Sequence, residues 1–186
     1  MQTLGYLLIG TLVFSGLITI ACVITLGNPV VQNPSPKLKR LGIAGLGSLF
    51  LQFCLGALLR DTHNGLACPN FPNCLDQFFP IPFTFWTAIA FFHRWLGVLM
   101  LGLFLHLAVE AARTTPSLAR PTRQAFALSV AQVFLGIGNV MGGLSSESRI
   151  IHAGVGYALW GILFYVTIRS GGCLKYIEAI RQFKWN

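Results

Sequence analysis

Two of the four histidines stand in the same local pattern, in which a glycine follows four residues later. These are His93 with Gly97 and His152 with Gly156. Each histidine lies in a long apolar stretch, where an ionisable side chain is costly and is a functional candidate by default. Because imidazole is a common metal ligand, the pattern makes both residues candidates for a metal-binding role.

The histidine pattern belongs to a longer repeat. The motif Q-x-x-L-G precedes each histidine, at residues 52–56 and at residues 132–136. The unit Q-x-x-L-G … H-x-x-x-G therefore occurs twice, with a longer connection in the first copy. Two hairpins with the same orientation predict a pseudo-two-fold axis along the membrane normal, as in other membrane proteins built from parallel repeats.

The elements that must position these residues are membrane-spanning helices. The chain has 186 residues, of which 54% are hydrophobic and 10% charged, whereas a soluble domain carries about a quarter charged residues. Long apolar runs with few or no charges predict membrane spans, and five are found, at 4–27, 41–59, 85–112, 124–143 and 150–170. The expected fold class is all-α: a polytopic membrane protein with about five transmembrane helices and a four-helix bundle made of two repeated hairpins.

The spans divide the chain into three expected parts. Residues 1–40 form an extra N-terminal transmembrane helix and a basic loop, residues 41–170 form the four-helix bundle, and residues 171–186 form a basic tail. The first span lacks a basic leading segment and a clear small-residue cleavage site, which favours a retained helix over a signal peptide.

The net charge of +8 is unevenly distributed. Ten of the thirteen basic residues fall in the first loop, the third loop and the C-terminal tail, which lie on one side of the membrane. Basic loops stay in the cytoplasm, so we expect the N-terminus outside and the C-terminus in the cytoplasm of a bacterial or archaeal cell. The charge therefore indicates membrane topology and not nucleic-acid binding.

This topology places His93 and His152 at similar depth near the external face, on helices related by the repeat. Two neutral imidazoles from facing helices are the axial ligands that a six-coordinate b-type heme requires. Zinc or copper would need further protein ligands, and no acidic or thiol residue lies near either histidine in these spans. The alternative is that both histidines only bond to backbone carbonyls.

Three arginines lie outside the cytoplasmic set, at or near the external ends of helices. Simple interfacial snorkelling would explain them. Their position beside both histidines equally predicts that Arg60, Arg94 and Arg149 bind an anion, and Arg94 and Arg149 are best placed to meet heme propionates.

The two remaining histidines carry weaker signals. His106 lies about 20 Å deeper than His93, at 1.5 Å per residue, but the end of the fifth span contains no histidine to pair with it. A second heme with two histidine ligands is therefore not expected, and a packed core residue is favoured over a single axial ligand or a proton carrier. His63 lies in the external loop without an assignable function.

The external loop between the second and third spans contains Cys68 and Cys74. They are the only cysteines on this side, which is oxidising in a bacterial inner membrane. A structural disulfide that pins the loop over the bundle is favoured over a thiol pair that exchanges electrons or disulfides with a partner.

These residues together resemble the heme A synthase family. The segment LGALLRDTHNGLACPNFPNC at residues 55–74 is similar to that family's external loop signature, R-x-T-x-x-G-L-x-C-P-x-x-P-x-C. The His93-Arg94 step, the Q-x-x-L-G motif at 132–136 and His152 match later parts of the same unit. The resemblance covers about residues 41–170 and leaves residues 1–30 outside.

The resemblance implies an oxidoreductase that converts the C8 methyl of heme O into the formyl group of heme A, with a b-type heme cofactor and an electron-transfer partner. Full-length members contain two four-helix bundles, so a half-length member with one bundle implies a homo-oligomer. The family's glutamate, three residues before the first histidine, is replaced here by Ala90. None of the nearest carboxylates, Asp61, Asp76 and Glu147, matches the motif, so no catalytic residue is assigned.

Two further function classes stay open. One is a b-type cytochrome that transfers electrons within a respiratory membrane complex and makes no product. The other is a heme-loaded assembly subunit that docks through its first span. Co-purification with a larger complex would favour either.

Overall fold

The computed structural model describes residues 2–27, 30–31 and 33–172, which form α-helices and the segments that connect them. The helices are α1 (Gln2–Leu26), α2 (Pro36–Asp61), α3 (Phe85–Thr114), α4 (Pro116–Met141) and α5 (Ser146–Arg169). All five are long and apolar enough to cross a membrane. The prediction of an all-α polytopic membrane protein with five spans is confirmed. Residues 173–186 of the expected basic tail lie outside the described residues.

Two helices begin earlier than their apolar runs. The expected span at 124–143 is part of α4, which begins at Pro116, and α2 begins at Pro36 after the N-cap Ser35, whose side chain accepts a hydrogen bond from Leu38 N. Proline suits a first helical turn because its φ is already helical and its missing N–H would be unpaired there. Hydropathy cannot detect these turns, because they carry basic residues. The third loop therefore shrinks to Thr115 alone.

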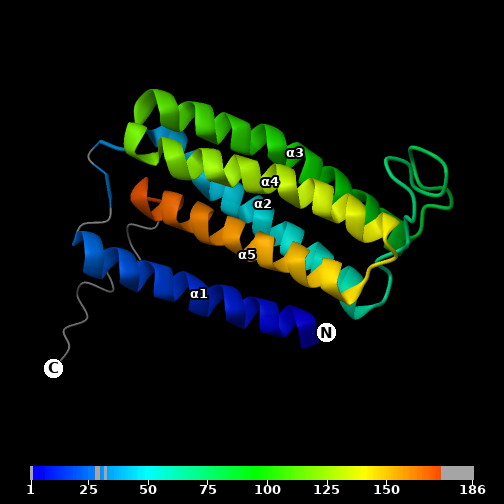
Figure 1. Ribbon diagram of the computed structural model, residues 1–186. Coiled ribbons are helices and arrows are strands. Elements are labelled where there is room, and N and C mark those ends of the chain that lie inside the picture. The colour runs from blue at the N-terminus through cyan, green and yellow to red at the C-terminus, as the bar shows by residue number, and fades with distance from the viewer. Residues whose placement is uncertain (1, 28–29, 32, 173–186) are drawn as a thin grey trace.

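The helices α2 to α5 form an antiparallel four-helix bundle, and α1 packs outside it against α2 and α5. The long loop at 62–84 projects from one end of the bundle, where α1 begins and α4 turns into α5 (Figure 1). We call this the cysteine-loop end. A cross-helix hydrogen bond holds α1 in place, from Trp160 Nε1 in α5 to Ser15 Oγ at 3.0 Å.

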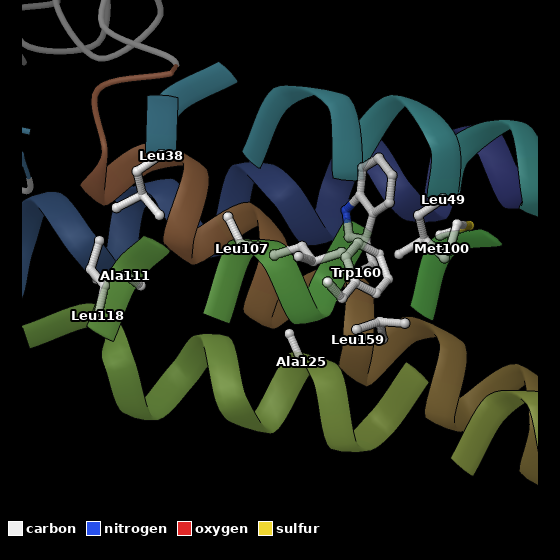
Figure 2. Packing of buried hydrophobic residues seen from close by; sticks show 11 residues of the cluster. Leu38, Leu49, Met100, Leu107, Ala111, Leu118, Ala125, Leu159 and Trp160 are labelled. Carbon is white, nitrogen blue, oxygen red and sulfur yellow. The ribbon is translucent and has the colours of Figure 1, made fainter. Parts of the chain in front are cut away.

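The larger apolar core cluster joins α2 to α5 (Figure 2), and most of its residues lie in the half of each helix away from the cysteine-loop end. Small residues let the helices approach closely there, as membrane helix packing favours. A Cβ at Gly42 would lie 2.9 Å from Thr167 Oγ1, and one at Gly45 would lie 3.0 Å from the Phe104 ring. The cluster contains Leu38, Leu49, Met100, Phe104, Leu107, Ala111, Leu118, Ala125, Leu159, Trp160 and Leu163.

Candidate functional site

A cavity of about 400 Å³ lies inside the bundle, toward the cysteine-loop end. This volume is within the range of small-molecule and cofactor sites, about 300–1,000 Å³. Both repeat histidines and both repeat glutamines line it, so the structure brings the duplicated motifs to one place. The floor is apolar and comes from the core cluster: Leu49, Met100, Phe104 and Leu159.

Each histidine ring lies against a glycine of the preceding helix in its own hairpin. A Cβ at Gly56 would be 3.1 Å from His93 Cε1, and a Cβ at Gly136 would be 3.5 Å from His152 Cε1. The final glycine of each Q-x-x-L-G motif therefore provides the space that an imidazole occupies. This contact occurs in both copies, although it is tighter in the first.

The glutamine of each motif uses the other glycine of the repeat. Gln52 Nε2 donates a hydrogen bond to the backbone carbonyl of His93 at 2.7 Å. A Cβ at Gly97 would lie 3.0 Å from that nitrogen, and a Cβ at Gly156 would lie 2.8 Å from Gln132 Nε2. The glycine four residues after each histidine, Gly97 or Gly156, therefore leaves room for a glutamine amide from the neighbouring helix. The sequence repeat did not by itself reveal this contact.

Four polar atoms of these side chains are buried without a hydrogen-bond partner in the described part of the chain. They are Nδ1 of His93 and His152 and Oε1 of Gln52 and Gln132. Leaving a buried polar atom unsatisfied costs about 1–3 kcal/mol, so each hairpin holds one ring nitrogen and one amide oxygen that still need a partner.

The donor set distinguishes between metals. Among the described residues, no group of three or more His, Cys, Asp or Glu side chains could hold a metal ion. A protein zinc site takes three or four such ligands. Two imidazoles at one cavity instead fit an iron whose remaining ligands come from a flat macrocycle.

Arg94 lies at the mouth of the cavity and holds the cysteine loop. Its Nη1 donates to the carbonyls of Asn70 at 2.6 Å and Asn73 at 2.7 Å, and its Nη2 donates to Cys68 O at 3.0 Å. The guanidinium also lies 5.3 Å from the centre of the Phe71 ring. Sequence reasoning missed this role, because it joins residues more than 20 positions apart. Propionate binding by Arg94 stays a prediction.

Two more cations line the cavity with exposed side chains. These are Arg60 at the end of α2 and Arg149 in the first turn of α5. Within the described part of the chain, the Arg149 guanidinium makes one long contact, 3.4 Å from Nη2 to Ser146 Oγ. The structure thus brings all three predicted arginines to the mouth of one cavity, together with the exposed His63.

The sulfur atoms of Cys68 and Cys74 lie at bonding distance, with their Cα atoms 4.6 Å apart. Both residues are buried in the loop, and Cys68 also lines the cavity. The backbones of Cys74 and Gln77 pair across a short turn. The loop is therefore compact and closes over one side of the mouth.

The sequence matches the model of the COX15-CtaA family, described as cytochrome oxidase assembly protein, over residues 3–164. The chain belongs to the COX15-CtaA family. A heme A synthase from Symbiobacterium thermophilum is 32% identical over 119 residues, which cover 63% of this chain and 39% of that protein. The chain thus spans about two fifths of the length of that relative. The family assignment made from the loop signature and the repeat is confirmed, and the matched range extends to α1.

Ala90 distinguishes the cavity of this COX15-CtaA chain from the family's substrate-handling bundle. Ala90 is buried and lines the cavity three residues before His93. None of the described residues that line the cavity is Asp or Glu. A methyl group therefore faces the position where the resemblance implies a carboxylate.

The preferred interpretation of His106 as a packed core residue is wrong, because its side chain is exposed on the outer face of α3. Thirteen residues of α-helix turn through about 220° beyond whole turns at 3.6 residues per turn. His106 therefore points away from the cavity that His93 lines.

Asn139 of α4 was missed by the sequence analysis: it is buried at the cavity wall, and its Oδ1 has no partner among the described residues.

Proposed function

We propose that this chain is a heme A synthase-like membrane oxidoreductase that binds a b-type heme between His93 and His152. The observation that supports it is the duplicated constellation at one cavity. Each histidine lies against its own glycine and lines the cavity. Two such imidazoles can supply both axial ligands of a low-spin heme iron.

The surrounding residues suit the rest of that cofactor. The apolar floor accepts the ring and excludes water, and the cations Arg60 and Arg149 at the mouth pair with its propionates. Arg94 contributes charge there while it holds the cysteine loop. In the proposed topology the mouth faces the outside of the cell, where a disulfide between Cys68 and Cys74 persists. When bound, the heme supplies one-electron redox chemistry.

The proposed role in heme A formation rests on family membership and on the likeness to a protein named heme A synthase. Oxidation of the heme O methyl to a formyl group takes one oxygen atom from water and releases four protons and four electrons, and we assign the electrons to a membrane electron-transfer partner. Because Ala90 leaves the cavity without a carboxylate, we assign this cavity to the resident heme cofactor. A second copy of the chain in a homo-oligomer would bring a second cavity for the substrate with the same Ala90, whereas a subunit of a larger respiratory complex would bring a different site.

Mass-spectrometric typing of the hemes extracted from the purified native protein tests this proposal. Heme B together with heme O, hydroxylated heme O or heme A is the expected result. Heme B alone would replace the synthase proposal with an electron-transfer subunit. A protein that carries no heme, and takes up none from added hemin, would overturn heme binding altogether.

A further inference from the structure

We infer that Gln52 and Gln132 position the two histidines, each by accepting a hydrogen bond from the Nδ1–H of the histidine in its own hairpin when Nε2 binds iron. This inference rests on the proposed heme binding. It assigns a role to two residues that act through the iron ligands and do not touch the iron.

The first support is the orientation of the Gln52 amide. Its Nε2 donates to the His93 carbonyl at 2.7 Å, so the side chain lies beside His93 and its nitrogen and oxygen cannot be exchanged without losing that bond. The Oε1 atom of the same amide is buried and has no partner among the described residues. A role in helix packing alone would account for Nε2 but would leave Oε1 unexplained.

The second support is chemical complementarity. A histidine that binds a metal through Nε2 carries its proton on Nδ1, and such an N–H almost always donates to a nearby oxygen. Gln52 Oε1 is a buried acceptor without a partner among the described residues, and the buried His93 Nδ1 makes no hydrogen bond of good geometry there, although the Gln52 backbone carbonyl also faces the ring. Pairing them satisfies both atoms at once.

The third support is duplication. His152 Nδ1 and Gln132 Oε1 are unpaired in the same way in the second hairpin. The glycines that make room for each amide, Gly97 and Gly156, also occur in both copies. The same set of unpaired atoms at two independent places is difficult to attribute to chance packing.

A hydrogen bond at Nδ1–H has a measurable electronic effect. It raises the basicity of the imidazole, and a more basic ligand stabilises ferric over ferrous iron. Loss of the bond should therefore raise the midpoint potential of the heme while both axial ligands stay in place. A purely structural role of the glutamines would not change the potential in this direction.

The test uses the full chain in detergent, loaded with hemin, and compares Gln52→Met and Gln132→Met with the native protein. We expect each variant to keep a low-spin spectrum and to shift its midpoint potential upward. A tenfold loss of preference for ferric heme corresponds to about 59 mV for a one-electron couple. The matched control is Gln124→Met, an exposed glutamine on α4 away from this cavity, which should leave the potential unchanged.

A second pair of variants displaces the glutamine without removing it. A Cβ at Gly97 meets Gln52 Nε2 at 3.0 Å, so Gly97→Ala should move the amide and raise the potential as well. Gly102→Ala on the same helix is the control, because a Cβ there meets no described atom within 4 Å.

The outcomes separate the two levels of the proposal. Failure of the native protein to bind hemin would remove the proposed function itself. Normal heme binding with unchanged potentials in Gln52→Met and Gly97→Ala would overturn the inference alone. If Gln52→Met loses its heme, the midpoint potential of Gly97→Ala tests the inference instead: a raised potential supports it and an unchanged one overturns it. Loss of heme from both kinds of variant would show a packing role, because one hydrogen bond does not determine ligation.

Discussion

The imidazole of His93 lies so close to Gly56 that a single added methyl group would sit 3.1 Å from its Cε1 atom. The corresponding distance in the second hairpin, from a methyl at position 136 to His152 Cε1, is 3.5 Å, an ordinary van der Waals contact. The two halves of the repeat therefore differ in how much space they leave beside the ligand.

This difference predicts unequal effects of two alanine substitutions. Gly56→Ala should displace the His93 ring, and overpacking of this kind costs about 1–3 kcal/mol. We expect heme binding roughly tenfold to a hundredfold weaker, measured by hemin titration of the apoprotein. Gly136→Ala should change the affinity much less, and Gly47→Ala, whose Cβ meets no described atom within 4 Å, should have no effect. Equal losses in all three variants would contradict the proposed contact.

Removal of either ligand should abolish the low-spin spectrum. In His93→Ala or His152→Ala the iron loses one of its two axial ligands, so we expect a high-spin or heme-free protein by absorption spectroscopy. His106→Ala is the control, because His106 is exposed outside the bundle. Full retention of the low-spin spectrum in either variant would exclude that histidine as an axial ligand.

Loss of the Arg94 guanidinium should loosen the cysteine loop. Arg94→Gln removes charged hydrogen bonds to Asn70, Asn73 and Cys68, each worth about 1.5–3 kcal/mol. We expect a membrane-impermeant reductant to open the Cys68–Cys74 bond at least about tenfold faster, followed by thiol labelling. Arg149→Gln removes no hydrogen bond to the described cysteine loop and should keep the native rate. An unchanged rate in Arg94→Gln would show that other contacts hold the loop.

The attachment of α1 should depend on Ser15. Ser15→Ala leaves the buried Trp160 Nε1 without its acceptor, and hydrogen bonds between membrane helices contribute about 0.6 kcal/mol on average and at most about 1.7 kcal/mol. We expect a small loss of unfolding free energy in detergent within that range. Thr25→Ala is the matched control, because Thr25 bonds only within its own helix to Ala21 O. A larger loss of unfolding free energy in Thr25→Ala than in Ser15→Ala would show that hydrogen bonds within α1, and not the bond to Trp160, determine its stability.

The sequence predicted the helices well because a bilayer imposes one requirement on every span, a long apolar run. It predicted the helix starts poorly, because proline and basic residues at 116–123 are helical but not apolar. The repeat correctly brought His93 and His152 to one cavity. It could not show which glycine faces which ring, because that depends on helix rotation and separation.

The role of Arg94 and the orientation of His106 illustrate the same limit. Charge near a helix end predicts an anion, yet the structure offers Arg94 the backbone carbonyls of a folded loop. Those acceptors carry no side-chain signal in the sequence. For His106 the helical period alone predicts that the side chain faces away from the cavity. Its depth in the membrane does not determine which way it faces.

The sealed floor of the cavity has an electrical consequence. Phe104, Leu107 and Leu159 are at most 1% exposed and lie between the site and the far end of the bundle. A layer of this kind insulates, so protons released in the proposed function would enter the compartment at the cysteine-loop end. Redox turnover in this cavity would then acidify or alkalise one side of the membrane only, without carrying protons across it.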